Sequence, residues 1–429
     1  MGRPDPTAVR PSDGLAHAIA LGKMLAALLL FTISPLALLE FGWQYGDTGG
    51  SPLEKFHPST LLAVLLIGLA AMTIAPNPLA GLLRLFAPYP ALLAYFATNV
   101  VMIFYAGLVL KLPVTMFVET FIGAGLIFVL FQTGDETTKR RIALLIHVAL
   151  LANALLAFYE AATQTKLTPL VVNGEVLADE PRSNALLGHP LANAMLMACY
   201  VVILAIGGGR DLARLARPVF FLVALASLIP FGGRAGTAAC LGALLFILVG
   251  KLWLVVRGGR VDTRTIIAGF IVWPVAGLGL LAAFEMGAFD TLTNRLFDDD
   301  GSAGTRIEMF QLFRYLTVND LLFGPDPDLL STWVRIHGLE YGIESFIIAF
   351  VLNYGLLAAV MFFPAFALFL RELIAVTRPG SWLVIVVFLL IALTSISLSA
   401  KSPTLSVFVL MLTILLRPTD ETAASGGSG

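Results

Sequence analysis

Charge is scarce in this 429-residue sequence, because only 13% of its residues are charged while 58% are hydrophobic. About a quarter of the residues in a soluble domain are charged, and two or three soluble domains of this total length could not enclose so large a core. The low charge excludes a disordered chain, a coiled coil and a soluble α/β enzyme. A net charge of −1 also excludes nucleic-acid binding through bulk charge. The composition is that of an all-α, polytopic membrane protein.

Cysteine is almost absent as well. The two cysteines, Cys199 and Cys240, lie in apolar runs without metal-ligand spacing, and we interpret them as small buried side chains. The sequence has no Walker, Rossmann, nucleophile-elbow or zinc motif. The acidic run 298–300 could hold a divalent cation, but its spacing matches no specific site and a solvated turn explains it more simply. We therefore expect no cofactor and no metal.

Long apolar runs make up most of the remaining sequence. A transmembrane helix needs about 20 mainly apolar residues, and about twelve such segments form one transmembrane domain over residues 1–429. The first span follows basic residues but has no small-residue cleavage site after it, so we interpret it as a retained helix rather than a signal peptide. The second, seventh and twelfth spans are short. The predicted spans are 18–39, 59–76, 89–110, 113–131, 142–160, 186–206, 216–231, 235–256, 265–288, 342–370, 381–399 and 403–416.

The basic residues predict the orientation of these spans, since Lys and Arg concentrate in cytoplasmic loops. When the N-terminus is placed in the cytoplasm and the loops alternate, 17 of the 27 Lys and Arg residues fall on the inner side and the other ten on the outer side. Most of the ten lie in two long loops, which the rule weighs lightly. We therefore expect both termini to be cytoplasmic.

The two long loops on the predicted outer side are 161–185 and, between spans nine and ten, 289–341. Loops of this length inside a compact protein are either functional or disordered. The aromatic residues of the second loop indicate order, so we expect it to contain short helices. The tail 418–429 ends in small residues and is expected to be flexible.

Three arginines, Arg182, Arg234 and Arg306, stand at the predicted outer face, close to the hydrocarbon, where charge is costly. Arg234 is wedged between two apolar runs beside glycines that allow close backbone approach. An arginine at a helix end can simply extend its charge into water, but arginines also bind phosphates through paired hydrogen bonds. Three of them on one side favour a lipid diphosphate over the central site of a transporter.

Proton-transfer candidates stand where the second long loop returns to the membrane. Glu344 lies at the start of span ten and suits a general base, although a carboxylate there can also act as a capping charge. His337, seven residues earlier, is an alternative base or an interfacial polar residue. His147, inside span five, is expected to hydrogen-bond a neighbouring helix.

Four further residues are candidates for substrate binding. His189 and Asn193 open span six, where His189 could instead cap the helix. Arg314 and Tyr341 lie in the second long loop, and a solvated charge is the simpler interpretation of Arg314.

Four short motifs between about 180 and 370 resemble the O-antigen ligase and O-antigen polymerase superfamily of bacterial membrane glycosyltransferases. Each motif is weak alone, and their order and spacing around a large outer loop make the ensemble more specific. The motifs are Gly188-His189-Pro190-Leu191-Ala192-Asn193; Gly233-Arg234-Ala235-Gly236; Gly304-Thr305-Arg306 followed by Leu321-Leu322-Phe323-Gly324; and Glu344-Ser345 ahead of Leu352-Asn353-Tyr354-Gly355-Leu356-Leu357.

The sequence differs at one position from the ligase branch of that superfamily. Ligases typically carry a histidine eleven residues before the glycine of the last motif, whereas this sequence has Glu344 at that distance from Gly355. An acidic residue there is similar to polymerase-type members and leaves His337 as a competing base.

The resemblance implies a GT-C-like fold in the bacterial inner membrane and a periplasmic active site. The implied partners are undecaprenyl-diphosphate-linked oligosaccharides and membrane lipid, and a chain-length regulator is a further candidate. Arg234, Arg306 and Arg182 would hold the diphosphate leaving group, and Glu344 would accept the proton of the attacking sugar hydroxyl. The implied activity is polymerisation of lipid-linked repeat units with inversion, for O-antigen, capsule or exopolysaccharide.

Two alternatives stay open. One is a ligase of the same superfamily that transfers the glycan to lipid A core. The other is a transporter or flippase of lipid-linked sugars, which would carry charges near the membrane midplane. Glu119 in span four and Glu285 in span nine leave room for it.

Overall fold

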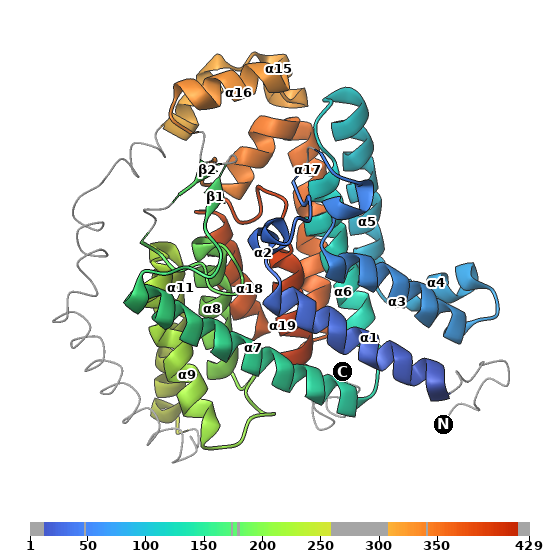
Figure 1. Ribbon diagram of the computed structural model, residues 1–429, viewed down its shortest axis with the longest axis vertical. Helices are drawn as coiled ribbons and strands as arrows, with labels where there is room; N and C mark the ends of the chain where they lie inside the picture. Colours follow the sequence, from blue (N-terminus) through green and yellow to red (C-terminus); the bar gives the residue numbers. More distant parts are fainter. Residues whose placement is uncertain are drawn as a thin grey trace.

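The computed structural model describes residues 13–46, 49–172, 175–177, 181–258, 308–339 and 342–418. These residues fold mainly into helices (Figure 1). The β-structure of the described part is one antiparallel pair of two-residue strands, β1 (Val171–Val172) and β2 (Glu175–Val176), in the first of the two long loops.

The helices divide into long apolar helices and shorter pieces that connect or extend them. In chain order they are α1 (Asp13–Thr32), α2 (Pro35–Glu40), the 3₁₀ helix η1 (Pro52–Lys55), α3 (Pro58–Ile74), α4 (Pro78–Phe86), α5 (Pro90–Phe104), the π-helices η2 (Tyr105–Val109) and η3 (Phe117–Ile122), α6 (Gly123–Gln132), α7 (Glu136–Thr163), α8 (Pro190–Ala205), α9 (Ala216–Ala226), α10 (Leu228–Phe231), α11 (Arg234–Val256), the 3₁₀ helix η4 (Leu312–Tyr315), α15 (Val318–Phe323), α16 (Pro327–Ile336), α17 (Phe346–Ala375), α18 (Ser381–Ala392) and α19 (Thr404–Leu415).

Eleven of the twelve predicted spans overlap these helices, and the ninth, 265–288, lies outside the described residues. Five described helices are long and apolar enough to cross a membrane, or six if the bent pair α3 and α4 forms one span. Helices such as α8, α18 and α19 have fewer than 18 residues. By length and composition, the described part is therefore an all-helical membrane protein with five or six spanning helices, short of the expected twelve.

Proline and a capping residue break one predicted span and bend the chain sharply after another. The span at 18–39 ends as α1 at Thr32, and Ser34 then caps α2 by accepting a hydrogen bond from the Ala37 amide at 3.0 Å. Beyond α3 the chain bends by 102° into α4, whose first residue is Pro78. Proline has no backbone N–H to donate, but the first residue of a helix has no carbonyl partner for its N–H in any case. A proline therefore fits the start of a new helix better than the interior of a continuing one.

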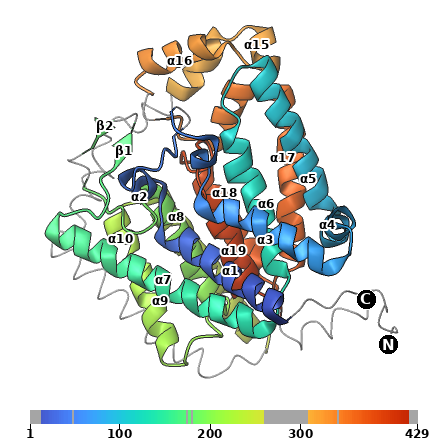
Figure 2. The same cartoon turned by 45° about the vertical axis from the view of Figure 1, so that its right-hand side comes forward.

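The helix α19 forms the centre of the bundle. It packs against α6, α8 and α7 (Figure 2), and all twelve of its residues are buried. Phe408 stacks on Phe388 of α18 with ring centroids 3.9 Å apart. A helix that is apolar on every face can be enclosed by lipid or by protein, and α19, only 12 residues long, is enclosed by protein.

Hydrogen bonds from the start of α3 explain why the polar side chain of Glu119 is tolerated inside a predicted span. Its side chain is fully buried and accepts hydrogen bonds from the His57 amide at 3.1 Å and from the Thr60 hydroxyl at 3.0 Å. Both donors belong to the start of α3, so the carboxylate satisfies a helix N-terminus. The His57 ring lies between the Ile33 carbonyl, 2.8 Å from Nε2, and Ser59, whose hydroxyl is 2.6 Å from Nδ1.

One end of the bundle is joined by an ion network, and we call it the inner end. Arg417 is 5% exposed and forms paired hydrogen bonds of 2.9 Å with Asp211 and one of 2.6 Å with Glu136. The Arg378 amide donates to the Leu416 carbonyl at 2.7 Å. The orientation prediction assigned all of these loops to one side, and they do meet at one end of the bundle. Which side of the membrane this end faces stays a prediction.

The opposite end, which we call the outer end, carries α15 and α16 above the bundle (Figure 1). The helix α17 breaks at Gly355, where φ is 83° and ψ is 165°. A Cβ atom at Gly355 would lie 2.5 Å from the Gly324 nitrogen, so the backbone at the end of α15 rests directly on this break. The Tyr105 hydroxyl donates to the Phe323 carbonyl. The second long loop thus contains short helices, as predicted, and they are fixed to the bundle.

Candidate functional site

Of the three predicted arginines, Arg182 lies against the turn at the outer end from which Arg234 follows. The amide of Ser183 donates to the Pro230 carbonyl at 3.0 Å, and a Cβ atom at Gly232 would lie 2.9 Å from Cγ of Arg182. Gly232 ends α10 with a φ of 62°, and Arg234 begins α11 two residues later. We call Arg182 and residues 230–234 the arginine corner. Both arginine side chains are partly buried.

A buried carboxylate, Glu160, holds the segment that carries Arg182. Glu160 is 3% exposed and lies near the end of α7. Its Oε1 accepts a hydrogen bond from the Leu167 amide at 2.9 Å, and its Oε2 accepts from the amides of Asn184 at 2.9 Å and Ala185 at 3.0 Å. Glu160 could not be predicted from the sequence, because nothing in the pattern of α7 distinguishes a buried Glu from an interfacial one.

Three asparagines continue this network to the start of α8. Asn193 is fully buried; its Nδ2 donates to the carbonyls of Asn184 at 2.6 Å and His189 at 3.1 Å, and its Oδ1 accepts from Asn153 at 2.8 Å. Asn153 also accepts from the Leu186 amide at 2.9 Å. The side chain of Asn193, a predicted substrate-binding residue, therefore forms these hydrogen bonds with protein groups and positions the segment before α8.

His189 caps α8, which was the simpler of its two predicted roles. Its Nδ1 accepts from the Leu191 amide at 3.2 Å while its side chain stays partly exposed. The predicted interhelical role of His147 is confirmed: its Nδ1 lies 2.7 Å from the Tyr200 hydroxyl of α8.

Close glycine contacts join the motifs in pairs. Cβ atoms at Gly233 and Gly236 would lie 2.3 Å from Cβ and 3.2 Å from the carbonyl oxygen of Ala194, so the start of α11 packs directly on α8. Gly324 and Gly355 make the corresponding contact between α15 and α17. Any larger side chain would separate these backbones, and each glycine belongs to a motif that carries the family resemblance.

A histidine–carboxylate pair lies in the second long loop. His337, at the end of α16, places Nδ1 2.6 Å from Oε2 of Glu308, and the two side chains are 13% and 34% exposed. The ring of Tyr315 lies 5.4 Å from the His337 ring and 5.6 Å from Trp333. Such a pair can orient an imidazole for proton transfer. His337 was a candidate from the sequence, whereas its partner Glu308 was not. The side chain of Arg314 is exposed nearby in η4.

Glu344 lies directly before Ser345, the residue that precedes α17, and is partly buried. Two residues earlier, Gly342 adopts a φ of 111° and packs against Ile396. Among the described residues, no hydrogen bond or ion pair joins Glu344 to the arginine corner. Arg306 and Tyr341 lie outside the described residues. Whether these groups meet around one substrate therefore stays a prediction.

The described helices and the polar groups gathered at their outer end are those of a helical membrane protein. In the part of the chain that the structure describes, no group of three or more His, Cys, Asp or Glu residues could hold a metal ion. Comparisons with protein-family models, curated proteins and solved structures found no match to the chain.

Proposed function

We propose that this protein is a glycosyltransferase that polymerises lipid-linked oligosaccharide repeat units. It would transfer a glycan from undecaprenyl diphosphate to a sugar hydroxyl of a second lipid-linked unit at the periplasmic face of the bacterial inner membrane. In this proposal the chain has about twelve spans in a GT-C-like arrangement, with cytoplasmic termini.

The observation that carries the proposal is the arginine corner. Arg182 and Arg234 come from segments about fifty residues apart, yet the Arg182 stem lies against Gly232. Two arginines carried by segments that touch each other suit a diphosphate, because each guanidinium group can form paired hydrogen bonds with phosphate oxygens. The resemblance of the four motifs adds the reaction type, and the glycine contacts pack the second motif on α8 and the third on the fourth.

The chemistry follows from these groups. The acceptor hydroxyl oxygen attacks the anomeric carbon from the side opposite the diphosphate, so the new glycosidic bond forms as the bond to the diphosphate oxygen breaks. Glu344 accepts the hydroxyl proton. His337, held by Glu308, is the competing base. The arginines stabilise the charge that develops on the undecaprenyl diphosphate as it leaves, and the direct displacement inverts the anomeric centre.

The test is a reconstituted reaction with purified protein and lipid-linked repeat units as the only substrate. A ladder of products is expected, and Arg182→Ala and Arg234→Ala should abolish it. Arg335→Ala, at an exposed position of α16 away from the arginine corner, is the matched control and should leave the ladder intact.

Three outcomes would contradict the proposal. Products that form only after lipid A core is added indicate the ligase. Movement of lipid-linked sugar across vesicles without new glycosidic bonds indicates the transporter. A full-length ladder from either arginine variant would refute the diphosphate clamp itself.

A further inference from the structure

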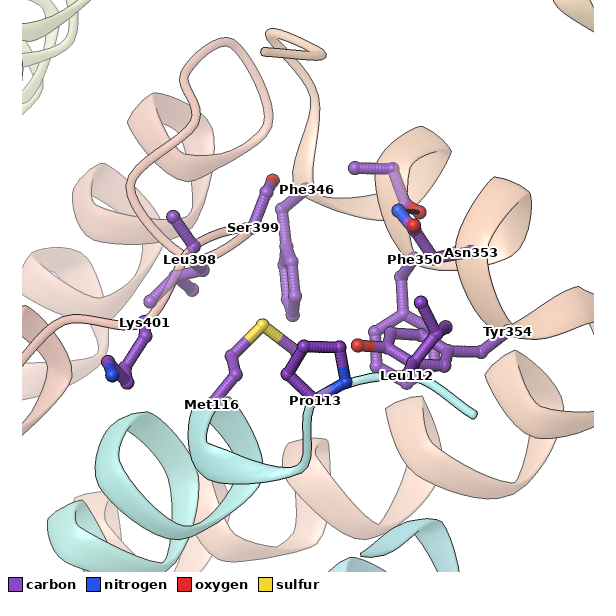
Figure 3. Close-up of a pocket in the computed structure, with 12 residues that line it drawn as sticks. Leu112, Pro113, Met116, Phe346, Phe350, Asn353, Tyr354, Leu398, Ser399 and Lys401 are labelled. Atoms are coloured by element: carbon purple, nitrogen blue, oxygen red, sulfur yellow. Dashed lines mark hydrogen bonds between the residues drawn. The ribbon is translucent and has the colours of Figure 1, made fainter. Parts of the chain in front are cut away.

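A cavity of about 250 Å³ opens at the outer end beside the first half of α17. Figure 3 shows Leu398 and Ser399 on one side, Phe350 and Asn353 on the other, Phe346 between them, and Pro113 and Met116 below. Drug-sized ligands occupy pockets of roughly 300–1,000 Å³, so this cavity suits a single sugar ring rather than an oligosaccharide.

The walls of the cavity are fixed by contacts on each side. Phe350 stacks on Phe362 at a centroid distance of 4.6 Å. Lys401 donates to the Tyr45 carbonyl and lies over the Tyr45 ring, and the Ser402 amide donates to the Thr120 hydroxyl at 3.0 Å. A pocket that is already formed loses little conformational freedom when a ligand binds.

The lining combines apolar side chains with a few polar groups. Phe346 and Phe350, which are 3% and 2% exposed, contribute small apolar surfaces, and Asn353 contributes an amide whose Nδ2 donates to the Ala349 carbonyl at 2.7 Å. The Ser399 hydroxyl is buried and has no hydrogen-bond partner among the described residues. A buried polar group without a partner is costly, so a ligand that hydrogen-bonds Ser399 would remove this cost.

This lining discriminates among ligand classes. An acyl chain would leave Ser399 without a partner. A phosphate needs a cation, but Lys401 directs its ammonium group to Tyr45, and Figure 3 shows the end of its side chain turned away from Phe346. A neutral sugar ring meets both requirements, because its C–H groups pack on apolar side chains and its hydroxyls can hydrogen-bond Ser399 and Asn353.

The cavity also lies close to Glu344 in the chain. Phe346 follows Glu344 by two residues, and the loop that contributes Ser399 is the one that Gly342 touches through Ile396. A sugar held in this cavity would therefore be bound by the same segment that carries the candidate base.

We propose that this cavity is a binding subsite for one neutral pyranose unit, the acceptor sugar of the glycosyl transfer. The assignment to the acceptor rests on the proposed function, whereas binding of a sugar ring does not.

The first experiment measures binding to the full-length protein in lipid nanodiscs. The probes are methyl glycosides of glucose, galactose, mannose, rhamnose and N-acetylglucosamine, observed by saturation-transfer NMR. At least one should bind. Ala400→Phe, which adds a ring at the exposed rim of the cavity, should abolish binding, whereas Ala94→Phe, on an exposed position of α5, should not. Ser399→Ala should weaken binding roughly five-fold, as expected for one neutral hydrogen bond, and Ser397→Ala should leave it unchanged.

The second experiment separates this proposal from the proposed function. In the polymerisation reaction, Ser399→Ala should raise the KM for the acceptor with little change in kcat. Polymer formation with an unchanged acceptor KM in Ser399→Ala and Ala400→Phe would overturn the subsite while the function stands. Glycoside binding that Ala400→Phe removes, in a protein that makes no polymer, would keep the sugar site and overturn the function. Binding of no glycoside, or binding that survives Ala400→Phe, would overturn the subsite.

Discussion

Removal of the Glu160 carboxylate should release the segment that positions Arg182. The three amides of Leu167, Asn184 and Ala185 would lose their acceptor inside the protein, where Glu160 is only 3% exposed. A hydrogen bond to a charged group contributes about 1.5–3 kcal/mol. Because the three share one carboxylate and are not additive, we expect Glu160→Ala to destabilise the segment by about 4 kcal/mol.

A comparison with Glu160→Gln sharpens this magnitude. The glutamine oxygen can still accept from Asn184 and Ala185, which share Oε2, whereas its NH₂ group would face the Leu167 amide. One unsatisfied donor costs about 1–3 kcal/mol, so Glu160→Gln should lose about half as much stability as Glu160→Ala. Glu40→Gln, at an exposed position, is the matched control and should have no effect.

The assay is amide hydrogen exchange, which reports local opening. Exchange at residues 167, 184 and 185 should accelerate by about three orders of magnitude in Glu160→Ala, since each 1.4 kcal/mol is a factor of ten, while α19 stays protected. Polymerisation should fall together with protection. Unchanged protection at all three amides in Glu160→Ala would refute this reasoning.

Three more perturbations test the packing. Gly355→Ala should lower the free energy of unfolding by more than about 3 kcal/mol, because its φ of 83° and ψ of 165° suit only glycine and a Cβ atom would lie 2.5 Å from backbone. The control Gly338→Ala, with a φ of 65° in open space, should lower it by about 1 kcal/mol. Equal losses of melting temperature in detergent would contradict this. Arg417→Gln should cost about 3–5 kcal/mol by leaving Asp211 buried without its partner, and the double variant Arg417→Met with Asp211→Leu should recover most of it in the same thermal assay. Burial lowers the pKa of His57 to about 4 from its ordinary 6.5. The folded state therefore binds fewer protons than the unfolded state, and stability should fall by about 2 kcal/mol from pH 7 to pH 5. If the same dependence of stability on pH persists in His57→Gln, His57 is not its cause.

The helices could be predicted from the sequence because membrane helices are continuous apolar runs. The breaks could not. The end of α1 before Pro35 and the 102° bend before Pro78 depend on local proline and capping geometry, which a hydropathy pattern averages away. Hydropathy also cannot separate a helix that faces lipid from one such as α19 that is enclosed by protein.

The candidate site was predictable where a residue type alone carries meaning. Arginines at the ends of spans indicated the arginine corner, because charge near hydrocarbon needs a reason. The residues that position it were not predictable, since Glu160 and Asn153 are recognised only by the backbone amides they bind. Asn193 was chosen for its place in a motif, and its hydrogen bonds in the structure are to protein groups.

The enclosure of α19 has a consequence for synthesis. This helix follows the other described helices in the chain, so α6, α7 and α8 leave the ribosome before the segment that fills the space between them. Until residues 404–415 arrive, the earlier helices have no central surface to pack on, and Arg417 has not yet joined Asp211 to Glu136. The bundle is therefore expected to close late, in a single step after translation has passed α19, and nascent chains that stop earlier should be substrates for membrane quality control.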